Sequence, residues 1–357
     1  MDTKKISLLW TFVLFLPSLI WAQIHVSYPF DGAVFQRNTS NQANISIGGS
    51  YTSAVDRIEA RVVAVAGGIT TAWTTIDAAP SGGLFRGFIF NVTGGWYSLE
   101  LRAVLFNNVT HTTSLSRVGV GEVLMIAGQS NGQGLYNFGS LPSSDANGRV
   151  RYVPWLLDCP NATCPNAEPP FPQIADMNGN AGGLSIAPNG RSTWAYAELG
   201  DALISRYSVP VIFFNAAADG SSVGNWSRSA DGLPSAHAFL GTQFANNPNF
   251  PYYGLRKALN YYGNMFGVRA VLWHQGESDN LKNHNGNPFD NTSDTEYRDS
   301  LLHVINQSRN HSAKSNLAWV VARASYLAAP FGGPTDANVI AGQNLIINAF
   351  NKIFTGP

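Results

Sequence analysis

The chain has 357 residues, enough for two domains of ordinary size, and 45% of them are hydrophobic while only 12% are charged. This composition excludes an intrinsically disordered chain, because such chains are usually polar and highly charged. The 22 basic and 22 acidic residues balance, and no basic patch or block of like charge indicates a polyanionic ligand, so no nucleic-acid partner is expected.

The N-terminus has the pattern of a secretory signal peptide. Lys4 and Lys5 precede an apolar run over residues 6–20, and a small residue, Ala22, ends the segment. A transmembrane anchor is the alternative, but the run is short against the roughly 20 residues that cross a bilayer. We expect a signal peptide over residues 1–22, a secreted (extracellular or periplasmic) protein, and no stable membrane anchor.

Residues 23–119 alternate apolar and polar side chains in short runs, such as those at 85–90 and 96–101. Gly, Asn, Pro and Ser clusters separate the runs, a spacing that predicts an antiparallel β-sandwich of immunoglobulin-like type. No cluster of chemically active residues occurs there. A spacer or packing module is the simplest role, and sugar binding is the functional alternative.

Residues 120–357 follow a different pattern, in which apolar strands alternate with helices. Strands are predicted at 122–127, 209–215, 270–273 and 317–324, and helices at 195–207, 253–266, 295–309 and 338–352. Strands without polar alternation, separated by helices, indicate a parallel sheet covered on both faces, and therefore an α/β domain. The Pro-, Asn- and Gly-rich stretch over 140–191 is predicted to be a long loop that forms a wall or lid.

Small polar segments follow three of these strands, at residues 128–132 (GQSNG), 215–222 (NAAADGSS) and 274–279 (HQGESD). In open parallel sheets, ligands bind beyond the carboxyl ends of the strands. The three segments are therefore predicted to meet in one site.

Ser130 is the candidate nucleophile of that site. Glycines on both sides allow a sharp turn from strand to helix, which exposes the hydroxyl. A neighbouring base could activate it, and free backbone N–H groups at the turn could stabilise an oxyanion. A helix N-cap serine and a phosphate-binding turn are the alternatives, although the segment lacks the Lys and the spacing of a P-loop.

The segments AGQSN and WHQGESD together resemble the branch of the SGNH hydrolases that contains sialate O-acetylesterases and acetylxylan esterases. The resemblance runs from Gly121 to the C-terminus. It implies a three-layer α/β/α flavodoxin-like domain that removes acetyl groups from sugar hydroxyls without a metal or other cofactor. It also implies that Ser130 is the nucleophile, and that the N–H groups of Ser130 and Gly220 and the side-chain amide of Gln275 form the oxyanion hole. Asp219 stands where the family usually has a first glycine, a departure that weakens the assignment of Gly220.

Several neighbouring residues have expected supporting roles. Asn131, Glu277 and Asp279 are predicted to hold the loops of the site, and a structural tie between loops is the alternative role for Gln275. A glycosidase pair of carboxylates is the alternative for the two acidic residues, but a strand-end loop offers no clear opposed geometry. Trp226 and Trp273 are candidates for the sugar site, with buried packing as the alternative.

The sequence shows no clear general base to activate Ser130. In the resembled family an Asp-x-x-His block near the C-terminus supplies it, and no such spacing follows Asp279; Asp299 and His303 are four residues apart. We expect the block to lie beyond Pro357 and the 357-residue chain to be nearly inactive alone. The alternatives are a protein that has lost its general base and a protein that uses His274 as the base.

The predicted function is that of a secreted carbohydrate O-acetylesterase, a carboxylic ester hydrolase acting on an acetylated carbohydrate. A catalytically silent glycan-binding protein on the same scaffold is the main alternative. An arylesterase or lipase-like hydrolase is a third, disfavoured because no apolar lid helix occurs. Cys159 and Cys164 are predicted to form a local disulfide rather than a metal site, since no His or further Cys lies near them.

Overall fold

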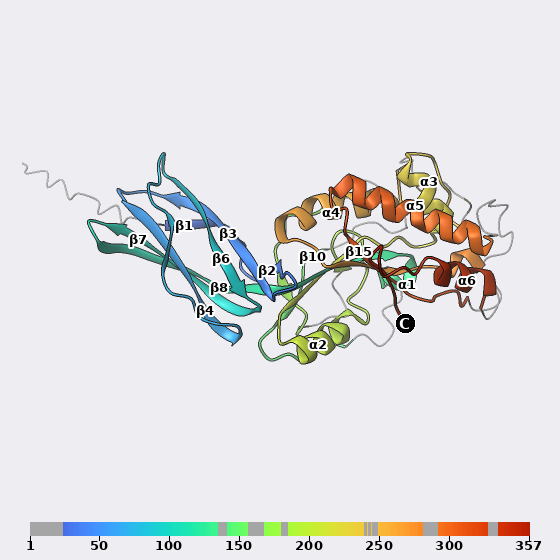
Figure 1. The fold of residues 1–357 in the computed structure, drawn as a ribbon, viewed down its shortest axis with the longest axis horizontal. Helices are drawn as coiled ribbons and strands as arrows, with labels where there is room; N and C mark the ends of the chain where they lie inside the picture. Colours follow the sequence, from blue (N-terminus) through green and yellow to red (C-terminus); the bar gives the residue numbers. More distant parts are fainter. Residues whose placement is uncertain are drawn as a thin grey trace, which may run out of the picture.

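The computed structural model describes residues 24–134, 141–155, 168–179, 185–238, 241, 244, 249–280, 292–327 and 335–357. The expected signal peptide and the expected Cys159–Cys164 disulfide lie outside these residues. Within them the chain is mixed α/β, with strands in the N-terminal third and alternating strands and helices after it (Figure 1). None of the helices described here has both the length and the apolarity to cross a membrane.

Two antiparallel ladders form the N-terminal third. One consists of β1 (Ile24–Tyr28), β3 (Gln42–Tyr51) and β6 (Leu84–Thr93). The other consists of β4 (Arg57–Gly67), β5 (Thr74–Asp77), β7 (Gly95–Leu105) and the first part of β8 (Asn108–Gly128), and β2 (Ala33–Gln36) pairs with β8 in parallel. The predicted alternation is confirmed: in β6, Phe85 and Ile89 are buried, whereas Phe88 and Phe90 are exposed.

Strand β8 is a single strand of 21 residues that belongs to both halves of the chain. Its first half pairs with β7, and its last residues pair in parallel with β13 (Val211–Asn215) and β14 (Ala270–His274). Where β8 passes from the first half of the chain to the second, a Cβ added to Gly121 would lie 1.9 Å from the carbonyl oxygen of Pro210. Glycine is therefore needed here for close backbone approach rather than for a turn. The domain boundary expected after residue 119 falls inside this strand.

The second half of the chain is built on a sheet in the order β11 (Ala175–Asp176), β9 (Val150–Tyr152), β13, β8, β14, β15 (Ala318–Val321) and β16 (Ile353–Thr355). All neighbours in it are parallel except β11 and β9. A separate two-stranded pair consists of β10 (Pro154–Trp155) and β12 (Ser185–Ile186).

The helices of this half are α1 (Ser130–Gln133), α2 (Tyr196–Tyr207), α3 (Val223–Ala230), α4 (Tyr252–Phe266), α5 (Asp294–Ser312) and α6 (Ala337–Leu345), with a 3₁₀ turn at Ser278–Asn280.

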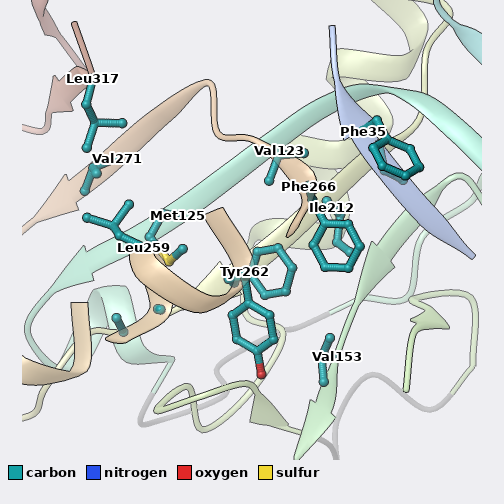
Figure 2. Packing of buried hydrophobic residues seen from close by; sticks show 14 of the residues in the cluster. Phe35, Val123, Met125, Val153, Ile212, Leu259, Tyr262, Phe266, Val271 and Leu317 are labelled. Carbon is teal, nitrogen blue, oxygen red and sulfur yellow. The ribbon is translucent and has the colours of Figure 1, made fainter. Parts of the chain in front are cut away.

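Helices cover both faces of this sheet, as its apolar strands predict. Met125 of β8 belongs to the same buried cluster as Tyr262 and Phe266 of α4, which lie over the strand in Figure 2. The next residue along β8, Ile126, points the other way and joins a second cluster with Tyr196 of α2. Because successive side chains of a strand alternate between faces, a strand buried on both sides must be apolar throughout.

Two sequence-based predictions were wrong in detail. The helix expected over 338–352 ends at Leu345, and the chain then forms β16, which pairs with β15. Pairing buries Ile353 opposite Trp319, a tertiary gain that outweighs local helical preference. In addition, the long loop expected over 140–191 contains β9, whose three residues are too few to give a periodic signal.

A buried carboxylate joins the N-terminal third to the parallel sheet. Glu122 of β8 is 6% exposed and accepts hydrogen bonds from Arg37 (2.7 Å) and Arg269 (2.6 Å). Burial alone would raise the pKa of Glu122, but the hydrogen bonds from Arg269, Gln36 and Arg37 hold it below its ordinary value.

We expect Glu122→Ala to lower the free energy of unfolding by about 3–5 kcal/mol, because it leaves two partly buried arginines without their shared acceptor. The matched control is Glu100→Ala, which breaks a half-exposed pair with Arg61 and should cost about 1 kcal/mol or less. Denaturant unfolding of both variants measures the difference. Equal losses would mean that the Glu122 cluster does not hold the two halves together.

Candidate active site

The three polar segments meet around the side chain of Gln129, at the carboxyl end of β8. Its Oε1 accepts hydrogen bonds from the backbone N–H groups of Gly276 (3.2 Å) and Ser278 (3.0 Å). The N–H of Ala218 donates to the carbonyl of Gly128 at 2.9 Å, which ties in the segment after β13. The predicted convergence of the segments is therefore confirmed. The sequence analysis did not single out Gln129. Its position between the motif residues Gly128 and Ser130 is the signal that could have identified it, because a buried amide at such a position needs hydrogen-bond partners.

Ser130 is the first residue of α1 and is partly exposed. Gln129, in extended conformation, is the N-cap of this helix, and Gly134 ends it in the left-handed region with a φ of 74°. The N-cap alternative for Ser130 is thus wrong. Among the residues that the structure describes, none forms a hydrogen bond with its hydroxyl, so the group is available for chemistry.

The two backbone N–H groups expected in the oxyanion hole have no acceptor either. Within the described part of the chain, neither Ser130 N–H nor Gly220 N–H has an acceptor. Gly220 has a φ of 62°, and a Cβ on it would lie 2.1 Å from the ring of His237. The N–H of Ala238 donates to the Gly220 carbonyl at 2.8 Å and fixes the loop. Only glycine fits this position, and its N–H is free to bind an anion.

Gln275 is fully buried, and its amide connects the loops. The Nε2 group donates to the carboxylate of Asp279, to the carbonyl of Ser221 at 3.1 Å and toward Gln129. The Oε1 atom accepts from the hydroxyl of Tyr297 at 3.0 Å. These contacts are those of the structural alternative, since protein acceptors already face the amide hydrogens. The oxyanion role of Gln275 stays a prediction.

Asn131 and Glu277 form a second contact between the segments. The exposed Asn131 side chain donates to Glu277 Oε1 at 2.7 Å. Glu277 is 4% exposed, and among the described residues it is held by side chains rather than by backbone N–H groups. His274 Nδ1 lies 3.6 Å from the same oxygen, and its side chain is 29% exposed. The neighbouring Gln275 is by contrast fully buried.

Asp279 holds the loop before α3. Its carboxylate accepts from the N–H of Val223 at 3.0 Å and from the hydroxyl of Thr292 at 2.8 Å. This is the loop-holding role that the sequence predicts for it. Burial raises the pKa of Asp279 to about 7, and the hydrogen bonds only partly offset this effect.

The raised pKa of Asp279 makes stability depend on pH. Between the unfolded pKa of 3.8 and about 7, the folded state holds a proton that the unfolded state has lost, so the free energy of unfolding falls as pH rises. We expect Asp279→Asn, which cannot titrate, to gain stability relative to the parent by up to about 1.4 kcal/mol per pH unit from pH 5 to 7, and then to level off. Unfolding of both proteins at each pH measures this difference; a constant difference would place the pKa elsewhere.

Neither tryptophan that was a candidate for the sugar site can line it. Trp226 and Trp273 are 0% and 1% exposed and pack edge to face, with ring centroids 5.2 Å apart. Trp226 Nε1 donates to Ser221 Oγ at 2.9 Å. Both rings form the packed layer beneath the loops.

Comparison with known proteins agrees with this arrangement. A family model described as carbohydrate esterase, sialic acid-specific acetylesterase, matches residues 120–347. The match includes all three strand-end segments. The chain belongs to the sialic acid-specific acetylesterase family of carbohydrate esterases.

Several solved structures are similar to the chain at low sequence identity. A carbohydrate acetylesterase from Xanthomonas citri is similar at 17% identity with a TM-score of 0.44, over 91% of this chain and 66% of that one, so the chain spans just under two thirds of its length. A protein from Arabidopsis thaliana is similar at 16% identity with a TM-score of 0.39, over 66% of this chain and 84% of that one. A peptidoglycan O-acetylesterase is similar at 8% identity with a TM-score of 0.25, over 94% and 63%. No curated protein gives a significant match.

Proposed function

We propose that the protein is a secreted carbohydrate O-acetylesterase that removes acetyl groups from glycan hydroxyls through Ser130. The proposal includes a three-layer flavodoxin-like esterase domain over residues 120–357 and a β-sandwich over 23–119. The observation that carries it is the hydroxyl of Ser130, which has no hydrogen-bond partner among the described residues and follows Gln129, the residue that ties the strand-end segments together. A hydroxyl without a partner, placed at the carboxyl end of a parallel sheet, is available to attack a bound ester.

The reaction that fits this arrangement is acyl transfer in two steps. Ser130 Oγ attacks the acetyl carbonyl carbon and loses its proton to a base, while the N–H groups of Ser130 and Gly220 bind the oxygen that becomes negative. The sugar oxygen then leaves with a proton, and an acetyl group remains on Ser130. Water attacks this ester in the same way, which releases acetate and restores the hydroxyl.

The alternative is a glycan-binding protein that keeps the scaffold without the chemistry. Release of acetate from O-acetylated sugars, measured with and without a fluorophosphonate serine reagent, separates the two. The proposed enzyme should lose its activity as the reagent forms one adduct on Ser130. Binding of the sugar with no acetate release and no adduct would support the alternative.

A further inference from the structure

The hairpin that joins β7 to β8 exposes an aromatic ring in an unfavourable backbone conformation. Leu105 pairs with Asn108, so Phe106 and Asn107 form a two-residue turn, with φ angles of 49° and 62°. Left-handed residues suit such a turn, but asparagine, aspartate and glycine normally occupy it, whereas a bulky side chain is strained there. Phe106 is also 80% exposed. The fold therefore holds this ring in place without burying it.

Hydrogen bonds fix the turn in this conformation. The N–H of Phe106 donates to the carboxylate of Asp56 at 2.6 Å, and the guanidinium of Arg57 donates to Asn107 Oδ1 at 3.1 Å. A strained backbone that its neighbours enforce in this way is most common where a protein holds another group. An exposed apolar ring on such a support is a surface that another group can cover.

Asn108, the first residue after the turn, has the sequence context of an N-glycosylation acceptor. It opens the sequon Asn108-Val109-Thr110. Its side chain is exposed, and its Nδ2 donates to the carbonyl oxygen of Phe106 at 3.1 Å. The atom that would carry a sugar therefore lies against the residue that carries the exposed ring. A glycosylated amide keeps one hydrogen, so this hydrogen bond can remain.

A second sequon shows what the fold excludes. Asn225, in the sequon Asn225-Trp226-Ser227, is 0% exposed, and its Oδ1 accepts the N–H of Ser222 at the start of α3. A glycan is bulky and needs solvent, so the folded protein cannot hold one there. The hairpin is different, because β8 runs from it for 21 residues before it ends in the parallel sheet (Figure 1). At about 3.3 Å per residue, a glycan on Asn108 lies far from Ser130.

We propose that Asn108 carries an N-linked glycan whose first sugar packs on the ring of Phe106. The inference rests on the proposed secretion, because this transfer takes place in the secretory compartment of eukaryotic cells. The donor is an oligosaccharide on a lipid pyrophosphate: a bond forms between Asn108 Nδ2 and C1 of the sugar, the bond from C1 to the pyrophosphate oxygen breaks, and the amide loses one proton. The C–H face of a pyranose is apolar and matches an aromatic ring, so the sugar covers the surface that the fold leaves exposed.

Site-resolved mass spectrometry of the full chain, produced in cultured eukaryotic cells, tests the attachment. The parent and Thr110→Ser should carry a glycan on Asn108. Thr110→Ala, which removes the sequon but keeps Asn108, should carry none there, and Asn225 should be unmodified in every variant. An unmodified Asn108 in secreted parent protein would overturn the inference.

Two versions of each chain separate this result from the question of secretion. One keeps its own residues 1–22, and the other has a proven secretory leader in their place. Protein that reaches the medium only with the substitute leader would count against the proposed secretion. The glycan on Asn108 would then still be decided by the version with the substitute leader.

Thermal unfolding of the secreted proteins tests the contact with Phe106. Loss of the glycan in Thr110→Ala should lower the unfolding midpoint by about 2–4 °C, the shift expected for a contact as strong as an aromatic pair. In a chain that also carries Phe106→Ala, the same loss should have much less effect. Phe350→Ala is the matched control, since Phe350 is 92% exposed in the other half of the chain and its removal should leave the effect of the glycan unchanged. Equal losses with and without the ring of Phe106 would overturn the proposed contact.

Discussion

Ser130→Ala is expected to abolish acetyl-ester hydrolysis by the active protein while leaving the fold intact. The hydroxyl supplies the attacking oxygen, and loss of a nucleophile in serine hydrolases lowers the rate on the order of 10⁶-fold. The Ser130 side chain is partly exposed, and no described residue bonds to its hydroxyl, so its removal leaves no buried group unpaired. The free energy of unfolding should therefore change by about 0.5 kcal/mol or less.

Acetate release and intact mass after fluorophosphonate treatment measure the two consequences together. The parent should gain one adduct, and Ser130→Ala should gain none. Ser144→Ala, which removes an exposed hydroxyl bonded to Asp201, is a control that should behave as the parent. If purified Ser130→Ala kept most of the activity, the nucleophile would have to be another residue.

Gln275→Ala is expected to have the second largest effect, and it separates two roles for this amide. As an oxyanion donor, Gln275 would be worth about 10²–10³-fold in kcat with little change in KM, because the donor acts on the transition state. As a tie between loops, it holds the buried groups of Asp279, Ser221 and Tyr297, so its loss should also cost about 1–3 kcal/mol of stability.

Gln343→Ala provides the comparison, because Gln343 belongs to the same buried network but bonds to carbonyls of Gln275 and Ala324. It should destabilise the fold to a similar degree with a much smaller effect on kcat. An equal fall in kcat for both variants would show that Gln275 acts only through the loops. A raised KM at constant kcat would instead make Gln275 a ground-state binding residue.

The sequence predicted the sheet well because its strands are buried on both sides. The first four residues of Val211–Asn215 are apolar without interruption, as expected for a strand of a covered parallel sheet. The failures have a different physical origin. Strands β9 and β16 contain three residues each and exist through pairing with a longer neighbour, so their local sequence carries little information. The domain boundary expected after residue 119 stays a prediction; it falls within β8, where close approach of Pro210 requires glycine at Gly121.

The sequence predicted which segments meet at the candidate site, while the roles of single residues in it stay predictions. Glycine spacing predicts the turn at Ser130, whereas Gly220 was singled out through the resemblance to the family. The partners of Gln275 could not be predicted, because they depend on how three loops and α5 pack together.

The continuous strand β8 also determines how the protein can be divided for experiments. No linker separates the two halves of the chain at this point. Strand β2 pairs with β8 from Val118 to Gly121, and so on both sides of the expected boundary at residue 119. A fragment beginning at Gly119 would lack Arg37 and would leave Glu122 short of one of its cations. It would also lack Phe35, whose ring packs at 6.3 Å against Phe266 of α4, and so uncover apolar surface on the esterase half. Such a fragment should aggregate, whereas a fragment that begins before β1 keeps every partner of the shared strand.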